Sequence, residues 1–336
     1  MTTRLEKLMT TLSNNAVTAR AHTNIALVKY WGKKDENLII PYTGSLSLTL
    51  DYFYTDTQVA FDANLTTDDV QIDGQPASAK TTARVSRFLD IVRQRSGITQ
   101  SAAVRSTNHV PTAAGLASSA SAFAALAAAS SRAAGMDLSL TDLSRLARRG
   151  SGSACRSIFG GFAEWQPGTD DTNSYAIPIK SHGLADLRVI ALTTAKGPKA
   201  ISSRQGMRLS VTTSPYYPAW IQTAQADLVA LKAALAAADF SAIGKISELN
   251  AMRMHALTLS ADPDFTYFNG QTLTIIDLVK SLRHSGVECY YTIDAGPNVK
   301  VLCQSETTEK IVTTFSKVLG DENVIVTKPG PGVQYL

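Results

Sequence analysis

Apolar and polar residues alternate in the N-terminal part of the chain with the period of β-strands. Residues 45–50 read Ser-Leu-Ser-Leu-Thr-Leu, which predicts a strand with one buried face. The short apolar runs at 24–29, 57–61 and 70–72 predict three more strands. An Asp73-Gly74 pair follows the last of these runs and predicts a turn.

Other segments follow the period of an amphipathic helix. In residues 81–97 the apolar positions fall on one side, and Gly97 is placed to end the helix. Residues 118–134 are rich in alanine, the best helix former. We expect further helices at 139–149, 220–238, 241–257 and 273–285, and further strands at 187–194, 288–293 and 299–303.

The predicted helices and strands do not alternate strictly, which favours an α+β fold over a doubly wound parallel sheet. The chain has 336 residues, a length that suits two domains at roughly 150 residues each. We place the boundary before the strand that starts at 187. This division gives an N-terminal domain at 1–186 and a C-terminal domain at 187–336.

Composition indicates a soluble globular chain and narrows its partners. Hydrophobic residues make up 44% of the chain and charged residues 18%, which suits a folded core rather than disorder. The net charge of +4 is mild and scattered, so we expect no nucleic-acid partner. The most apolar stretch, 115–134, is alanine broken by serine and arginine, and residues 1–20 lack the apolar run of a secretory signal. We therefore expect no membrane partner.

The cysteines and histidines predict neither a disulfide framework nor a metal cage. The three cysteines, Cys155, Cys289 and Cys303, are odd in number and lack paired spacing. Free thiols are typical of a reducing compartment, so we expect a cytoplasmic protein. The five histidines are dispersed and lack metal-ligand spacing.

The first candidate for chemistry is the segment 111–121, Pro-Thr-Ala-Ala-Gly-Leu-Ala-Ser-Ser-Ala-Ser. Small residues here lead directly into a predicted helix, whose unpaired N–H groups and dipole suit a phosphate. Ser118 and Ser119 would add hydroxyl donors. The segment is no Walker A loop, because no Gly-Lys-Ser/Thr follows. By composition alone, a serine-capped alanine helix packed on a sheet explains the segment as well as a phosphate site does.

The pattern Pro-x-x-x-Gly-Leu-x-Ser-Ser-Ala resembles the phosphate loop of the GHMP kinase superfamily. Four further segments resemble, in the same order, motifs of mevalonate diphosphate decarboxylases; they lie at 24–33, 151–157, 201–207 and 292–298. The chain departs from that family at Gly44 and Gln205, where Ser and Asp are common. The stretch 196–199 is also looser than the family's paired lysines.

The resemblance implies a fold and an activity. The expected fold has an N-terminal domain like domain 2 of ribosomal protein S5, a ferredoxin-like C-terminal domain, and the active site between them. The expected reaction is the ATP-dependent decarboxylation of mevalonate 5-diphosphate by a homodimeric enzyme. A phosphomevalonate decarboxylase, a mevalonate-type kinase that stops at phosphoryl transfer, and a non-catalytic ligand-binding relative stay open as alternatives.

The resemblance also assigns catalytic roles. Asp294 is expected to act on the substrate hydroxyl, although Asp-Ala-Gly-Pro also suits an ordinary turn. Arg156 is expected to hold the substrate carboxylate, with Asn24 fixing it. Ser203 would contact the substrate and the transferred phosphoryl group. Lys199 would meet the γ-phosphate and Asp294, with a solvated loop lysine as the alternative, whereas Lys29 is expected to be only a neighbouring structural cation.

Binding residues follow from the same motifs. The substrate set is Tyr30, Lys33, Ser151, Gly152, Ser153, Arg156, Arg204 and Met207, although a lone methionine such as Met207 also suits core packing. The ATP set is Ser106, Pro111, Ala113, Ala114, Gly115, Leu116, Ala117, Ser118 and Ser119. Mg²⁺ is expected to arrive with ATP rather than to occupy a protein cage, with Ser118 as its candidate contact.

Overall fold

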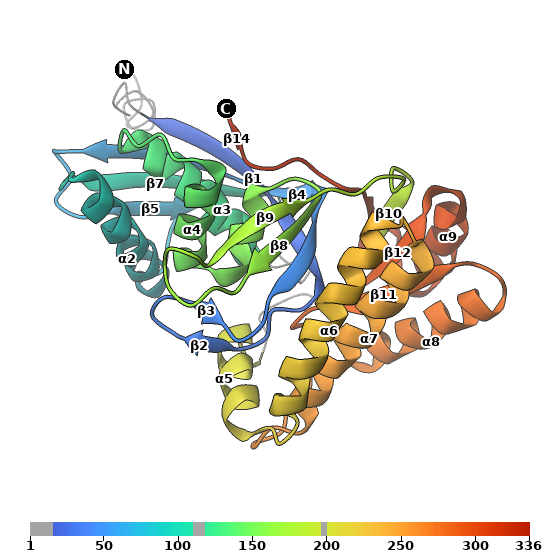
Figure 1. The fold of residues 1–336 in the computed structure, drawn as a ribbon. Coiled ribbons are helices and arrows are strands. Elements are labelled where there is room, and N and C mark those ends of the chain that lie inside the picture. The colour runs from blue at the N-terminus through green and yellow to red at the C-terminus, as the bar shows by residue number, and fades with distance from the viewer. Residues whose placement is uncertain (1–15, 110–117, 196–199) are drawn as a thin grey trace.

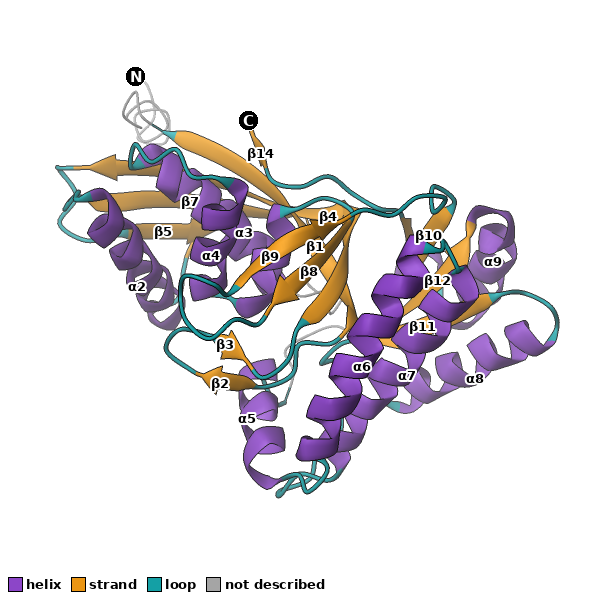
Figure 2. Ribbon diagram, viewed as in Figure 1, coloured by secondary structure: helices purple, strands orange, loops and turns teal. Residues whose placement is uncertain are grey.

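The structure is a computed structural model that describes residues 16–109, 118–195 and 200–336, without the side chain of Ser118. Its strands form two main sheets (Figures 1 and 2). The larger sheet runs β14-β1-β4-β7-β5-β6, and β8 and β9 extend it from β4. Its strands are β1 (Val17–Val28), β4 (Ser45–Asp62), β5 (Asp69–Ile72), β6 (Gln75–Pro76), β7 (Ser101–His109), β8 (Phe162–Gln166), β9 (Tyr175–Ile179) and β14 (Gln334–Tyr335).

The smaller sheet is antiparallel and runs β11-β12-β10-β13. Its strands are β10 (Leu187–Leu192), β11 (Cys289–Ile293), β12 (Val299–Gln304) and β13 (Val324–Thr327). A separate hairpin pairs β2 (Lys33–Asp35) with β3 (Ile40–Pro41). This mixture of antiparallel strands and helices without strict alternation confirms the predicted α+β class.

Helices cover both sheets. The described helices are α2 (Ala79–Ser96), α3 (Ser118–Ala133), α4 (Leu140–Gly150), α5 (Ser203–Thr213), α6 (Tyr217–Ala236), α7 (Phe240–Leu259), α8 (Gly270–His284) and α9 (Thr308–Leu319), with short 3₁₀ turns η1 (Gly152–Ile158), η2 (Ser305–Thr307) and η3 (Asp321–Asn323). In Figure 2, α2, α3 and α4 lie together beside the large sheet, and α8 and α9 lie at the opposite end of the molecule. None of the helices in the described ranges is long and apolar enough to span a membrane.

Separate apolar clusters explain this arrangement. One joins α2, α3 and α4 to the large sheet, with Phe88 and Phe123 among its members. A second joins Ile25 and Leu48 of the large sheet to the smaller sheet, α6 and α7. Because this second cluster is shared by both sheets, burying it fixes how the two domains face each other.

Two strands expected at 45–50 and 57–61 are in fact one continuous strand, β4, so that division was wrong. Two carboxylates, Asp51 and Asp56, separate the two predicted strands in the sequence, but both have partners in the fold. Asp51 accepts hydrogen bonds from the Thr327 hydroxyl at 2.7 Å and from the Lys328 amide at 3.0 Å. Asp56 accepts hydrogen bonds from Nε and from one terminal nitrogen of Arg20, each at 2.7 Å. These partners satisfy the charges and let the strand continue.

The C-terminal segment returns from the smaller sheet to the larger one. After β13, Pro329 forms a bridge with Leu50, and the Gly330 carbonyl accepts a hydrogen bond from the Gly161 amide at 2.9 Å. The strand β14 then pairs with β1. The last residues of the chain therefore help to hold the two domains together.

One histidine is buried without polar support in the described part of the chain. His255 of α7 is 1% exposed, and its ring lies 4.3 Å from the ring of Phe268. Neither ring nitrogen has a hydrogen-bond partner among the described residues. Burial, together with the nearby charge of Lys29, lowers the pKa of His255 to about 3. The imidazole is therefore neutral at physiological pH.

Because His255 is buried in its neutral form, we expect the free energy of unfolding to decrease at acidic pH. The ordinary pKa of about 6.5 applies in the unfolded chain. Because the folded value is lower, protonation favours unfolding, and stability falls as the pH drops below about 6.5. Between pH 7 and pH 5 this loss is about 2 kcal/mol. The variant His255→Phe keeps an aromatic ring against Phe268 but cannot titrate, so we expect its urea unfolding to lack this part of the pH dependence.

The matched control is His182→Phe, since His182 is exposed. It should show the same difference in unfolding free energy between pH 7 and pH 5 as the parent chain. A full acid loss in His255→Phe would contradict the interpretation.

Candidate functional site

Residues from both domains line one cavity of about 490 Å³. It collects cations, hydroxyls and one carboxylate from segments far apart in sequence. Twelve of the residues predicted from the sequence lie in its wall: Asn24, Tyr30, Lys33, Ser119, Ser151, Gly152, Ser153, Arg156, Ser203, Arg204, Met207 and Asp294. Lys29, Lys80 and Arg84 also line it. Such a wall suits a ligand with several negative charges.

The carboxylate of Asp294 lies at the end of β11, where the smaller sheet meets β1. Lys29 Nζ contacts Asp294 Oδ1 at 2.8 Å, and also donates to the Ala26 carbonyl at 2.8 Å and to the Thr292 hydroxyl at 2.7 Å. These acceptors match the three donors of an ammonium group. Burial lowers the pKa of Lys29, while the charge of Asp294 opposes this shift. Lys29 is thus a direct partner of Asp294 and more than the neighbouring cation expected from the sequence.

Arg156 projects from η1 and is 2% exposed. Its Nε donates to the Ser47 hydroxyl at 2.9 Å, one terminal nitrogen donates to the Ser45 hydroxyl, and the other donates to Asn24 Oδ1 at 3.4 Å. All these partners are neutral, so the guanidinium keeps its full charge at the cavity. Burial lowers its pKa, although an arginine stays protonated in proteins.

Asn24 connects β1 to η1. Its amide nitrogen donates to the Ser153 carbonyl at 3.0 Å and to the Ser157 hydroxyl at 2.8 Å. The same side chain accepts from Arg156. The amide therefore holds both the backbone that carries Ser153 and the guanidinium next to it.

The backbone of η1 passes very close to the cavity wall at Gly152. A Cβ atom there would lie 2.8 Å from the Trp165 ring and 2.9 Å from the Tyr30 ring. These two rings pack edge to face with centroids 4.7 Å apart. A side chain at this position would therefore have to displace these two rings, which favours glycine.

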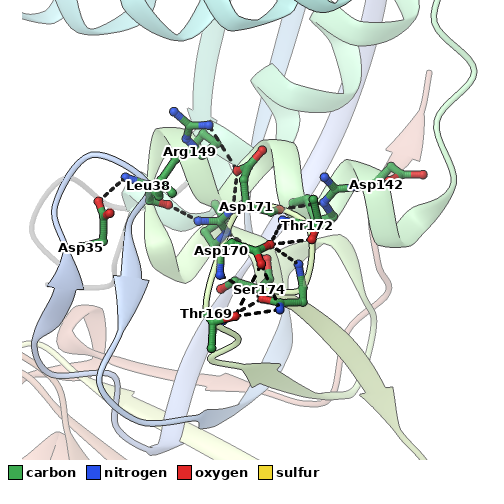
Figure 3. A network of polar contacts seen from close by, with 12 residues as sticks. Asp35, Leu38, Asp142, Arg149, Thr169, Asp170, Asp171, Thr172 and Ser174 are labelled. Atoms are coloured by element: carbon green, nitrogen blue, oxygen red, sulfur yellow. Dashed lines mark hydrogen bonds and ion pairs between the residues drawn. The ribbon is translucent and has the colours of Figure 1, made fainter.

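Lys33 is carried by the β2–β3 hairpin, which Arg148 ties to the rest of the domain. The Arg148 side chain is fully buried and donates to the Leu38 carbonyl of the hairpin, to the Ser174 carbonyl at 2.9 Å and to Asp171 at 2.6 Å. Figure 3 shows this network between the hairpin and the loop that carries Asp171. It fixes the hairpin against α4, whose end leads into Ser151 and η1.

The sharp turn before Lys33 depends on Gly32. Its φ of +113° lies outside the range that residues with a side chain adopt, and a Cβ atom there would overlap the Tyr217 hydroxyl. That hydroxyl donates to the Trp31 carbonyl at 2.9 Å. The contact joins the Lys33 segment to α6 of the C-terminal domain.

Helix α5, which the sequence analysis did not predict, presents its N-terminus to the cavity. Ser202 caps it by accepting a hydrogen bond from the Gln205 amide, and Ser203 and Arg204 occupy its first turn. A helix N-terminus carries partial positive charge, which suits an anion. Met207 is 8% exposed and packs in the cluster around Trp31 and Tyr217, so it serves as core as well as cavity wall.

A second cavity of about 310 Å³ shares Lys80, Arg84 and Ser119 with the first. Ser106, predicted for ATP, lines only this second cavity, beside Phe123. Burial and the charge of Arg204 lower the pKa of Arg84 to about 10. The sequence analysis missed Lys80 and Arg84. Arg84 lies in the helix predicted at 81–97, and Lys80 precedes Arg84 by four residues, just before that helix. This spacing, which places both on one face once the helix begins at Ala79, is the signal that could have found them.

Several predicted residues lie outside the described part of the chain. They are Lys199 and the loop residues Pro111, Ala113, Ala114, Gly115, Leu116 and Ala117, together with the side chain of Ser118. Of the phosphate loop, the structure places Ser119, whose hydroxyl accepts a hydrogen bond from the Ser151 hydroxyl at 3.4 Å. Within the described ranges, no group of three or more His, Cys, Asp and Glu side chains is arranged to hold a metal ion.

The two-domain α+β fold with its cation-lined cavity is that of a GHMP kinase-like protein. The chain belongs to the diphosphomevalonate decarboxylase family. Residues 21–176 match the family described as diphosphomevalonate decarboxylase-like N-terminal domain. Residues 189–330 match the mevalonate 5-diphosphate decarboxylase C-terminal domain.

Individual relatives agree with this assignment. The diphosphomevalonate decarboxylase of Ganoderma lucidum is 35% identical over 325 residues, which cover 89% of this chain and 81% of the relative. The crystal structure of mevalonate diphosphate decarboxylase from Staphylococcus aureus is 46% identical, with a TM-score of 0.93 over 96% of this chain and 98% of that one. A structure described as "MDDEF in complex with MVAPP, AMPPCP and Magnesium" is 47% identical, with the same TM-score and the same coverage.

The close packing at Gly152 predicts a measurable defect. In Gly152→Ala, the added methyl group must displace the rings of Trp165 and Tyr30, which costs about 1–3 kcal/mol. We expect a lower thermal unfolding temperature and weaker binding of the phosphorylated substrate, because Tyr30 forms part of the cavity wall. Thermal unfolding and substrate titration measure the two effects.

Gly270→Ala is the matched control. Gly270 lies in the first turn of α8, and a Cβ atom there would meet no atom within 4 Å. It should leave both quantities unchanged, and equal behaviour of the two variants would contradict the role of close packing at Gly152.

Proposed function

We propose that the protein catalyses the ATP-dependent decarboxylation of mevalonate 5-diphosphate to isopentenyl diphosphate, CO₂, ADP and phosphate. The activity serves the mevalonate pathway of isoprenoid biosynthesis. The observation that carries the proposal is the pairing of Asp294 with Lys29 in a cavity that also holds the buried Arg156. Membership of the diphosphomevalonate decarboxylase family supports it.

The chemistry explains why these groups are needed. A tertiary hydroxyl is a weak nucleophile, and hydroxide is a poor leaving group. Transfer of the γ-phosphoryl group from ATP to the 3-hydroxyl releases ADP and a proton, and it creates a phosphate leaving group. When the C3–O bond breaks, C3 becomes electron-deficient. The bond to the carboxylate then supplies its electron pair to the new double bond as CO₂ leaves.

Asp294 orients the 3-hydroxyl and accepts its proton. Arg156 holds the C1 carboxylate through a planar guanidinium whose other contacts are to neutral oxygens. Asn24 keeps that guanidinium in place. Ser203, at the first turn of α5, contacts the substrate and the transferred phosphoryl group. Lys199, in the predicted role, stabilises negative charge during transfer.

The 5-diphosphate is bound by the remaining substrate residues in the wall of the cavity. The two phosphates meet cations of the hairpin and of α5, hydroxyls of η1, and the wall around Met207. The set is Tyr30, Lys33, Ser151, Gly152, Ser153, Arg204 and Met207. We add Arg84, because it lines the same cavity.

The nucleotide occupies the second cavity, with Ser106 and Ser119 in its wall and its phosphates directed towards Lys80. A relative in complex with AMPPCP, an ATP analogue, and magnesium supports ATP as a ligand, and the position in the second cavity rests on its lining residues. The donors of the described site are cations and hydroxyls rather than clustered carboxylates, which fits a Mg²⁺ ion held largely by phosphate oxygens and water. Bound Mg²⁺ would neutralise phosphate charge.

We also propose a homodimer in the cytoplasm, with a domain boundary at residues 186/187. The three free, buried cysteines support a reducing compartment. The start of β10 at Leu187, in the smaller sheet, supports the boundary. Sedimentation equilibrium tests the dimer, because a mass near 35.9 kDa at micromolar concentration would contradict it.

The activity is tested by measuring CO₂ and ADP together. With ATP and mevalonate 5-diphosphate we expect one CO₂ for each ADP. With the 5-monophosphate we expect much lower kcat/KM, since fewer phosphate oxygens reach Lys33, Arg84 and Arg204. A preference for the monophosphate, or ADP release without CO₂, would replace the proposal by a phosphomevalonate decarboxylase or by a kinase. Binding without turnover would indicate a non-catalytic relative.

The carboxylate is tested with Asp294→Asn. We expect kcat to fall at least ~100-fold, because general-base catalysis contributes about that much or more, while the substrate still binds in a calorimetric titration. Asp137→Asn is the control, since the Asp137 side chain is 95% exposed and lies outside the cavity. A near-normal rate in Asp294→Asn would refute the role of Asp294.

A further inference from the structure

A second buried lysine, Lys300, faces Asp294. Lys300 is the second residue of β12 and is 1% exposed. In the sheet its neighbours are Thr292 on β11 and Ala191 on β10. A lysine in the interior of a central strand is costly unless an anion or hydrogen-bond acceptors compensate its charge.

Lys300 reaches both ends of the connection between β11 and β12. Its Nζ lies 3.7 Å from Asp294 Oδ2 and donates to the Asn298 carbonyl at 3.2 Å. Lys29 holds the other carboxylate oxygen, Oδ1, at 2.8 Å. Each oxygen of Asp294 therefore faces a different lysine, one from each domain. A carboxylate held at both oxygens is restricted in its rotation about the Cβ–Cγ bond.

The same connection anchors the segment that follows β10. Asn298 Oδ1 accepts hydrogen bonds from the Thr194 amide at 2.7 Å and from the Ala195 amide at 3.2 Å. Lys300 thus joins Asp294, through Asn298, to the backbone that leads towards Lys199. These hydrogen bonds of Lys300 and Asn298 all lie at the end of the smaller sheet that faces the cavity.

The positive charge of Lys300 also favours the ionised form of the Asp294 carboxylate. Within the described part of the chain, four titratable groups interact electrostatically with Asp294. They are Lys29 just after β1, Lys300 on β12, Arg156 on η1 and His255 on α7. His255 is neutral near pH 7, since its pKa is lowered by burial to about 3. A triphosphate, a diphosphate and a carboxylate arriving nearby all favour protonation of Asp294. The lysine behind it opposes that effect.

We propose that Lys300 is a positioning residue for the decarboxylation, holding Oδ2 of Asp294 and keeping the carboxylate ionised when the anionic substrates are bound. Lys300 does not touch the reacting atoms and acts through Asp294. The inference rests on the proposed function of the site.

The test is Lys300→Met, which removes the charge and keeps an unbranched side chain. We expect kcat at pH 7 to fall about tenfold or more. We also expect the pH at which kcat is half-maximal on the acid side to rise by about one unit, because an opposite charge at this distance shifts a carboxyl by that order. The KM for the diphosphate substrate should change less than about twofold, since Lys300 does not contact it.

Lys232→Met is the matched control. Lys232 on α6 also pairs with a carboxylate of the other domain, Glu164 at 3.2 Å, but it lies outside the cavity. It should leave kcat and its acid-side half-point unchanged.

A double-mutant cycle identifies the route of the effect. If Lys300 acts through Asp294, then Lys300→Met should not further reduce the residual single-turnover rate of Asp294→Asn. An equal reduction in both backgrounds would overturn the proposal, as would a parent-like pH profile of kcat in Lys300→Met.

Folding of the variant is followed by thermal unfolding. If Lys300→Met does not fold, Lys300→Gln takes its place, because the amide can still donate to the Asn298 carbonyl, and the same criteria apply. Loss of folding in both variants would assign Lys300 to the stability of the domain interface and overturn the proposal. A parent chain that releases no CO₂ from the diphosphate would instead refute the proposed function itself.

Discussion

Lys29 and Asp294 come from different sheets, and their contact at 2.8 Å lies where those sheets meet. A buried ammonium must use its three donors, and Lys29 uses them on one carbonyl, one hydroxyl and one carboxylate. The acceptors Thr292 and Asp294 belong to β11 and the turn after it, whereas Ala26 belongs to β1. The Asp294 carboxylate is therefore placed correctly only when the two domains pack correctly against each other.

Among the described residues, the buried charges around this contact do not sum to zero. Lys29, Arg156 and Lys300 are each buried to 2% exposure or less, and the carboxylate they share is that of Asp294. Three cations and one anion leave a charge of +2 on these four side chains. Burial opposes such a charge, so an anion entering the cavity is favoured beyond its direct hydrogen bonds. The fold thus prepares the site for a substrate that carries a carboxylate and phosphates.

Sequence reasoning located the residues that stand in compact motifs, such as Asp294, Arg156 and Ser153, because a motif keeps its local order in every fold that uses it. It gave Lys29 only the role of a neighbouring structural cation, and it assigned no role to Lys300. Each lies in or next to an apolar run, and the alternation of a half-buried strand predicts that a lysine there faces solvent. Both are buried because the end of β1 packs against β11 and β12. Helix α5 was missed for a similar reason. Its Gly206, Val211 and Thr213 disfavour a helix, and packing of Met207 in the apolar cluster with Trp31 and Tyr217 stabilises it.

Buried arginines have two different roles in this molecule, one structural and one in ligand binding. The role depends on whether a carboxylate of the protein neutralises the guanidinium. Arg148 is surrounded by the Leu38 and Ser174 carbonyls and by Asp171, so its charge is neutralised inside the N-terminal domain and its effect is mechanical. Arg156 is equally buried but has hydroxyl and amide partners, which orient the guanidinium without neutralising it. The compensating anion must then come from the ligand. A mild net charge of +4 therefore conceals a strongly positive site, because acidic residues such as Asp56, Asp171 and Glu248 pair with arginines elsewhere in the fold.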